Sequence, residues 1–339
     1  MEQPAIALYR ILGNELPPRH ERGQVCRNLR FILEHEPCFP NCLKKWVVNR
    51  IVYSGLEKEI IALLERYRQP YIHIPFDLRE YKRCGGKSID DEGMGRRLSS
   101  KTDRERHDKI LYVANINKAR NMALEDGRKI ADWILPFDGN SCFTQDGWDA
   151  MVRTLASQTT VDGWFAVSMY RLLDNRHYFR FSPCEYEEHE PQFVFGRKCA
   201  FVFDETRRYG DMDKSELSLR AGVACKDRGY GLIVLDPAHR CGYVVRLFSG
   251  IERAEGKWYD RAPLREKALD ILLDKLDRCR SQGAVDRLFD IEYKRDAFIS
   301  PIRFLLRPLR RSAERFVGLL KRGIKLKGYE ERRTDKQNS

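Results

Sequence analysis

The turn Asp138-Gly139-Asn140 combines residue types and spacing that favour ligand chemistry. It follows a short apolar run at 133–137, which predicts a buried strand. A carboxylate just past the end of such a strand stands at the rim of an open α/β sheet, where ligands bind. The glycine lets another backbone or a diphosphate come close. The alternative is that Asp138 caps the following turn and Gly139 only supplies its geometry.

A basic segment precedes this strand. Between Asn117 and Lys129, apolar residues recur at helical spacing, and Arg120 lies near the start of the predicted helix. The order is therefore basic helix, buried strand, acidic turn. We assign Arg120 to ligand binding at the same rim as Asp138 and Gly139.

Two other polar groups stand beside apolar runs. Asn49 and Arg50 interrupt the run 46–52, and a buried strand tolerates them only if they are paired or point at a cleft. Glu190 and Gln192 precede the apolar run 193–195. We expect them to hold substrate hydroxyl groups at the cleft, on a loop fixed by a proline; a solvated loop is the alternative.

These residues need a framework of alternating strands and helices. Strands are expected at 5–12, 46–52, 70–76, 133–137, 163–170, 193–195, 231–235 and 243–247, and helices at 28–33, 57–67, 117–129, 148–155 and 264–279. The alternation predicts an α/β fold with a mostly parallel central sheet and helices on both faces. Residues 82–108, rich in glycine, serine and charge, are expected to form a flexible loop.

The composition is that of an ordinary globular protein. With 339 residues, 42% of them hydrophobic, the chain can bury one large α/β core and a smaller appendage. No stretch reaches the length of a spanning helix and no signal-peptide layout is present, so we expect a cytoplasmic protein. The 10 cysteines are then free thiols. Cys38 and Cys42 could begin a zinc site, but no second pair follows, which argues against zinc.

The formal net charge of +12 implies an anionic partner. Much of the basic excess lies in 300–333, where an apolar helical stripe stands among arginines and lysines. Such a helix is typical of a segment on the anionic inner face of a membrane. A helix that docks on the chain's own core is the alternative. Nucleic acid is not expected, because no nucleic-acid-binding motif is found.

Two stretches resemble a known family. Ala119-Arg120-Asn121, a glycine at Gly127 and the strand ending at Asp138 resemble the nucleotide-sugar half of GT-A type glycosyltransferases, the family 2-like group above all. The resemblance implies a GT-A fold over roughly residues 5–250. It implies that Asp138 lies near the donor ribose and that Asp138 and Asn140 hold a divalent cation, Mn²⁺ or Mg²⁺, on the donor diphosphate. The family usually has aspartate where Asn140 stands, so we expect weaker metal affinity.

The second stretch, 203–220, matches the family's Phe-Asp-Glu, a glycine, and an acidic residue opening a helix that ends in Leu-x-x-Arg. The resemblance implies that this acidic residue is the general base that takes the proton of the acceptor hydroxyl. Glu216 is the first candidate and Asp213 the second, with Asp138 as a further catalytic residue. Helix capping by the aspartate is the alternative.

The resemblance also implies donor contacts, because the first strand of the family's fold ends at the nucleotide. Arg10, Asn14 and Arg19 lie there, and Asn49 and Arg50 close the next strand. For Arg19 and His20, a place on the loop surface is the alternative. Late in the chain, Arg246 is expected to reach back to the substrate at the diphosphate.

The sequence thus predicts a GT-A domain at 1–250, packing helices at 251–299, and a basic amphipathic helix with a tail at 300–339. The predicted function is inverting transfer of a hexose from a nucleotide-sugar donor to a saccharide or lipid-linked acceptor, as in polysaccharide biosynthesis. Two alternatives stay open. One is a catalytically inactive GT-A fold that serves as a binding module, and the other is a basic membrane-peripheral scaffold.

Overall fold

The computed structural model describes residues 4–84, 101–186, 188–210, 215–220, 224–226, 233–235, 237–249 and 258–296. The chain divides into two compact units, residues 1–286 and 287–339. All elements discussed below belong to the first unit, apart from the last part of a helix over 282–296. The predicted base Asp213 and the predicted basic helix 300–333 lie outside the described residues.

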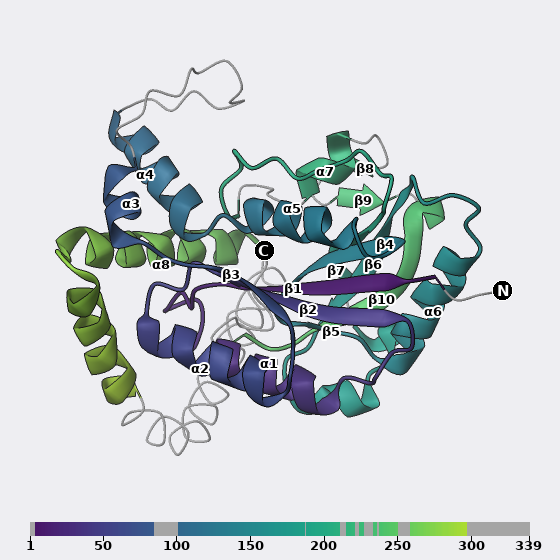
Figure 1. The fold of residues 1–339 in the computed structure, drawn as a ribbon, viewed down its shortest axis with the longest axis horizontal. Coiled ribbons are helices and arrows are strands. Elements are labelled where there is room, and N and C mark those ends of the chain that lie inside the picture. Colours follow the sequence, from purple (N-terminus) through teal and green to yellow (C-terminus); the bar gives the residue numbers. More distant parts are fainter. Residues whose placement is uncertain are drawn as a thin grey trace, which may run out of the picture. The chain divides into compact units, whose positions relative to one another are not determined.

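A central sheet organises the first unit (Figure 1). Its strand order is β3-β2-β1-β4-β7-β6-β10-β5, and a separate pair is formed by β8 and β9. The strands are β1 (Ile6–Leu12), β2 (Cys42–Asn49), β3 (Tyr71–Ile74), β4 (Trp133–Asp138), β5 (Ser141–Cys142), β6 (Trp164–Arg171), β7 (Glu188–Gly196), β8 (Ala224–Lys226), β9 (Ile233–Leu235) and β10 (Arg240–Arg246).

The sheet is mixed, whereas the sequence predicts a mostly parallel one. Strands β1 to β4 pair in parallel, and β6 pairs in parallel with β10. Strand β7 runs antiparallel to both β4 and β6, and β5 runs antiparallel to β10. The reversal follows from the connection between β6 and β7, whose described part holds 3₁₀ turns at Asn175–Arg180 and Pro183–Glu185. Without a crossover helix, the chain returns beside β6 in the opposite direction.

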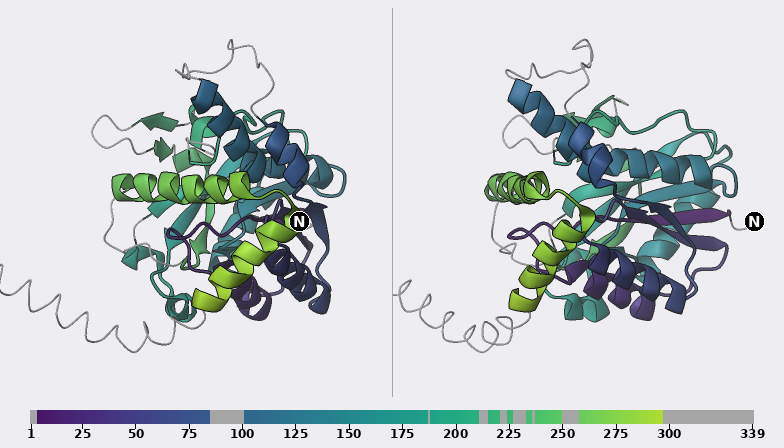
Figure 2. Two further views of the ribbon diagram at one scale, coloured as in Figure 1. Left: turned by 90° about the vertical axis from the view of Figure 1, so that its left-hand side faces the viewer. Right: turned by 60° about the vertical axis from the view of Figure 1, so that its left-hand side comes forward.

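Helices cover both faces of the sheet, as predicted (Figures 1 and 2). Side chains alternate along β1. Ala7 and Tyr9 pack in the cluster that contains α5 (Ile116–Gly127), while Ile6 and Leu8 pack in the cluster that contains α6 (Gln145–Ala156). The helices are α1 (Gln24–His35), α2 (Ser54–Arg66), α3 (Leu78–Arg83), α4 (Lys101–Val113), α5 (Ile116–Gly127), α6 (Gln145–Ala156), α7 (Ser215–Arg220) and α8 (Trp258–Arg278).

Helix α4 begins at Lys101 and so occupies part of 82–108, where the sequence predicts a loop. Tertiary ion pairs explain the difference. Arg106 contacts Asp270 at 2.6 Å and Lys109 contacts Asp277 at 3.0 Å, both on α8. A helix stabilised by charges on a distant helix shows no wide apolar stripe in its own sequence. Residues 85–100 lie outside the described part of the chain.

Strand β7 begins at Glu188, so Glu190 and Gln192 lie in a strand and not in the predicted loop. Opposite β6, Gln192 pairs with Val167 and residue 189 pairs with Met169. The β7 segment between these pairs is one residue longer than its partner, which makes a β-bulge. Pro191, which cannot donate a ladder hydrogen bond, stands inside this bulge.

In the described residues, no helix has both the length and the apolar character needed to cross a membrane.

Candidate functional site

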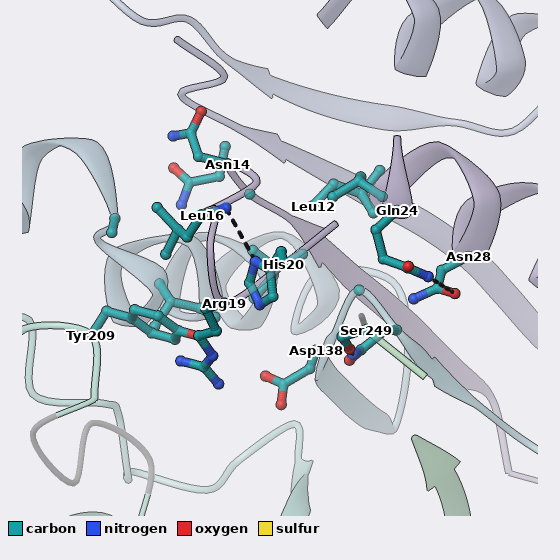
Figure 3. A pocket seen from close by; sticks show the side chains of 18 of the residues that line it. Leu12, Asn14, Leu16, Arg19, His20, Gln24, Asn28, Asp138, Tyr209 and Ser249 are labelled. Carbon is teal, nitrogen blue, oxygen red and sulfur yellow. Dashed lines mark hydrogen bonds between the residues drawn. The ribbon is translucent and has the colours of Figure 1, made fainter. Parts of the chain in front are cut away.

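A pocket lies at the carboxyl ends of β1 and β4, where the predicted rim of the sheet is (Figure 3). Its lining runs from Ile11 to Leu272 in the sequence, so residues far apart along the chain surround one space. The polar lining residues are Asn14, Arg19, His20, Gln24, Asn28, Asn49, Arg120, Asp138, Asn140, Glu190, Tyr209, Arg246, Ser249 and Arg265.

Asp138 is held in place on one side of the pocket by two buried side chains. Its Oδ1 accepts a hydrogen bond from Arg120 Nη2 at 2.9 Å, and its Oδ2 accepts one from Gln192 Nε2 at 2.9 Å. Arg120 is 1% exposed and Gln192 is fully buried, whereas the Asp138 side chain is 21% exposed. The carboxylate therefore has a fixed orientation and a neutralising partner behind it, and it lines the pocket.

Gly139 is required by close packing of the turn. A Cβ atom at this position would lie 2.5 Å from the carbonyl oxygen of Ile11 on β1. The turn is also hydrogen-bonded to the segment that follows β10, because Asn140 Nδ2 donates to Ser249 Oγ at 2.7 Å. The backbone oxygen of Asn140 accepts from Leu247 N at 2.9 Å. Asn140 thus joins two loops of the rim.

The loop between β1 and α1 brings Arg19 and His20 to the pocket. Glu15 stabilises this loop, since its carboxylate accepts hydrogen bonds from Gly23 N at 2.8 Å and from Val25 N at 2.9 Å. Asn14 fixes the start of the loop through hydrogen bonds with three backbone groups. These groups are Arg50 O, Val113 O and Val52 N, at 2.8, 3.0 and 2.8 Å.

Three arginines form the cationic wall of the pocket, namely Arg19, Arg246 and Arg265. Two of them contact the ring of Tyr209, with the guanidinium carbon of Arg19 at 5.3 Å and that of Arg265 at 5.6 Å from its centre. Such cation–π contacts hold both guanidinium planes. Burial, followed by the positive charge of Arg19, lowers the pKa of the Arg246 guanidinium, while Asp138 has an opposing effect.

His20 is a neutral hydrogen-bond donor in this wall. Burial, followed by the charges of Arg19, Arg246 and Arg171, holds the pKa of His20 well below its ordinary value. Its Nδ1 accepts from Leu16 N at 3.2 Å, as Figure 3 shows. The proton of the neutral ring therefore lies on Nε2, which is free of the Leu16 contact.

The state of His20 makes stability depend on pH. The unfolded chain takes up a proton at this residue below about pH 6.5, whereas the folded chain does not. We expect the free energy of unfolding to fall as the pH drops below that value, by up to about 1.4 kcal/mol per pH unit from this group. His20→Asn, which keeps an acceptor for Leu16 N, should flatten this part of the profile in urea unfolding.

The exposed His177 provides the control for this measurement. His177→Asn should leave the pH profile of stability as it is in the wild type. A profile that His20→Asn does not flatten would show that His20 is protonated in the folded chain.

The predicted metal site at Asp138 and Asn140 does not fit the described residues. No group of three or more His, Cys, Asp or Glu side chains that could hold an ion occurs among them. Both oxygens of Asp138 accept hydrogen bonds, one of them from a buried arginine, and the amide nitrogen of Asn140 is used on Ser249. A carboxylate already neutralised by a guanidinium is a weak ligand for a hard cation.

The structure brings together most of the residues that the sequence singles out. Nine of them line the pocket, namely Asn14, Arg19, Asn49, Arg120, Asp138, Gly139, Asn140, Glu190 and Arg246. Gln192 is predicted to contact the substrate, but it does not line the pocket. It donates a hydrogen bond to Asp138 and so orients that carboxylate. Asn49 is 3% exposed and donates to Asn115 O at 3.2 Å.

Arg10, Arg50 and Glu216 do not line the pocket, although the sequence predicts them as site residues. Arg10 is 1% exposed and forms an ion pair with the buried Glu36, because its position on β1 points to the face opposite α5. The guanidinium of Arg50 lies over the ring of Tyr112, at 4.9 Å. Glu216 on α7 faces Arg220, with 3.7 Å between Oε1 and Nε.

Sequence reasoning missed Tyr209 and Arg265 as site residues and left His20 open between the site and the loop surface. His20 stands beside Arg19 in a polar loop after the first strand, so the position of that loop could have indicated it. Tyr209 and Arg265 are far apart in the sequence and come to the pocket only through tertiary packing. No local pattern marks them.

No protein-family model matches the chain, and no curated protein matches it either. Among solved structures, the chain is similar to the mannosyltransferase PcManGT from Pyrobaculum calidifontis, determined in complex with GDP-Man and Mn²⁺, with a TM-score of 0.39 and 12% identity. This match covers 86% of the present chain and 69% of that chain. A 4-diphosphocytidyl-2C-methyl-D-erythritol synthase is similar with a TM-score of 0.29 and 13% identity, over 70% of this chain and 94% of that chain. Likenesses this weak assign no function.

Proposed function

We propose that the chain is a GT-A type glycosyltransferase that binds a nucleotide-sugar donor in this pocket. It moves the sugar, a hexose, to a saccharide or lipid-linked acceptor with inversion at the anomeric carbon. The observation that carries the proposal is one juxtaposition. The pocket lies at the carboxyl ends of parallel strands. It is lined both by the oriented carboxylate of Asp138 and by the arginines of the cationic wall.

This arrangement suits the two polar parts of a nucleoside diphosphate, the ribose and the diphosphate. The exposed part of the Asp138 carboxylate can accept hydrogen bonds from ribose hydroxyls, because an ionised carboxylate is purely an acceptor. Arg19 and Arg246 offer guanidinium groups, whose planar donors match phosphate oxygens. The apolar side chains of Leu12 and Val113 line the same pocket and can contact a base or sugar ring.

Glu190 is the carboxylate that we assign to acceptor activation. It lies in the bulge of β7, it is exposed, and it lines the pocket together with Asp138. The acceptor oxygen attacks the anomeric carbon and gives its proton to Glu190, while the bond from that carbon to the diphosphate oxygen breaks. The leaving nucleoside diphosphate takes the electron pair and is stabilised by the arginines and by His20 Nε2–H.

Binding of nucleotides tests this proposal. We expect UDP, GDP, CDP or ADP to raise the melting temperature, because a ligand that binds only the folded chain stabilises it by mass action. The matching nucleoside and inorganic phosphate should each act much more weakly, since each fills one half of the pocket. If none of the four diphosphates stabilises the chain, with or without Mn²⁺, the nucleotide-sugar proposal is wrong.

A further inference from the structure

The charges that line the pocket are unbalanced. Of the residues that the structure describes, four arginines line it, namely Arg19, Arg120, Arg246 and Arg265, and two carboxylates, Asp138 and Glu190. Arg120 and Asp138 neutralise each other at 2.9 Å. Among the described lining residues, this leaves the guanidinium groups of Arg19, Arg246 and Arg265 beside the carboxylate of Glu190. This surplus of positive charge favours an anion in the pocket.

Two of the cations are close enough to disfavour each other. Arg19 is 6% exposed, and its charge acts on Arg246 strongly enough to lower the pKa of that guanidinium, after burial itself. In the described part of the chain, Nε of Arg246 is buried and has no hydrogen-bond partner. Partly buried like charges destabilise the free protein, and an anion between them relieves this cost.

The same arrangement disfavours a divalent cation. An ion beside Asp138 would have to compete with Arg120 and Gln192 for the carboxylate oxygens. It would also lie near the guanidinium of Arg246, whose charge interacts with Asp138. The neutral amide of Asn140 contributes no compensating charge.

We propose that Arg19 and Arg246 neutralise the donor diphosphate directly, so that nucleotide binding requires no divalent cation. Arg19 keeps its orientation through the ring of Tyr209, and Arg246 is placed by β10 at the rim. The inference rests on the proposed function, because it concerns the diphosphate of the same donor.

Titration calorimetry of the full chain with GDP and with UDP tests the inference, in EDTA and in Mn²⁺. We expect the nucleotide that binds to have the same affinity in both solutions, within about twofold. Binding that is found only with Mn²⁺ would overturn the arginine inference and leave the proposed function standing. If neither GDP nor UDP binds, CDP and ADP are titrated in the same way, and absence of binding by all four in both solutions would count against the proposed function itself.

Substitutions at Arg246 separate a binding role from a structural one. Arg246→Gln should weaken nucleotide binding roughly 10- to 100-fold, the usual effect of losing hydrogen bonds to a charged group. The same change removes a repulsive charge, so the melting temperature of the free protein should stay equal or rise. Arg246→Lys keeps the charge without the planar fork and should restore part of the affinity.

Arg153→Gln provides the control, because Arg153 is exposed on α6 and does not line the pocket. It removes the same charge and should leave the affinity unchanged. If Arg246→Gln binds as tightly as Arg153→Gln, the arginines do not hold the diphosphate and the inference is wrong. The comparison of EDTA with Mn²⁺ on the wild-type chain decides the matter even if a variant fails to fold.

Discussion

Glu190→Gln is expected to lower the rate of sugar transfer by roughly 10²- to 10⁴-fold, the usual contribution of a general base. The substitution keeps the shape of the side chain and removes its ability to accept a proton. Nucleotide binding should remain, because the arginine wall and Asp138 are unchanged. The measurement is the single-turnover rate at saturating donor, together with the affinity for the nucleoside diphosphate.

Glu216→Gln is the matched control for this prediction. Glu216 faces Arg220 on α7 and does not line the pocket, so its amide variant should keep near wild-type transfer. Loss of transfer in Glu216→Gln with transfer kept in Glu190→Gln would return the base to the place that the sequence resemblance implies. Asp213→Asn extends the comparison to the second predicted base.

Glu36→Ala should destabilise the fold by about 3–5 kcal/mol, as expected when one partner of a buried ion pair is removed. The Glu36 side chain is fully buried and contacts both Arg10 and Lys44, the latter at 3.0 Å. It also accepts a hydrogen bond from Phe143 N at 2.8 Å. Urea unfolding, followed by circular dichroism, measures the change.

The combined change of Glu36→Leu and Arg10→Met should recover much of this stability, because it replaces the pair by apolar groups. Arg10→Met alone should leave the nucleotide affinity of the folded chain as it is. A loss of affinity comparable to that of Arg246→Gln would instead mean that Arg10 contacts the donor. A loss of less than about 1 kcal/mol in Glu36→Ala would show that the pair is solvated, as exposed pairs are.

The sequence predicts the α/β alternation well wherever burial leaves a periodic pattern. The apolar run 133–137 corresponds to β4, and the helical pattern before it corresponds to α5. Strand direction could not be predicted in the same way for β7, because it depends on the connection and not on the strand's own residues. The charged helix α4 was missed for a related reason, since its partners lie on α8.

In the candidate site too, the residues that belong to a local pattern can be predicted from the sequence, and those that depend on tertiary contacts cannot. The sequence predicts Asp138 and Gly139 as site residues because a buried strand followed by a carboxylate and a glycine is a local pattern. The burial of Arg10 depends on which face of β1 it occupies, and Glu36 is distant from it in the sequence. The contacts of Tyr209 with Arg19 and Arg265 join three separate segments, so only the folded chain reveals them.

The release of nucleoside diphosphate from a nucleotide sugar tests the central claim most directly. In the absence of acceptor, water can take the place of the acceptor hydroxyl, so the wild-type chain should slowly release the diphosphate from the donor whose nucleotide it binds. Arg246→Gln should release it more slowly at subsaturating donor, and Arg153→Gln should behave like the wild type. A chain that binds the nucleoside diphosphate yet consumes none of its sugar donors, with or without saccharide and lipid-linked acceptors, would be a binding module and would contradict the proposed transferase.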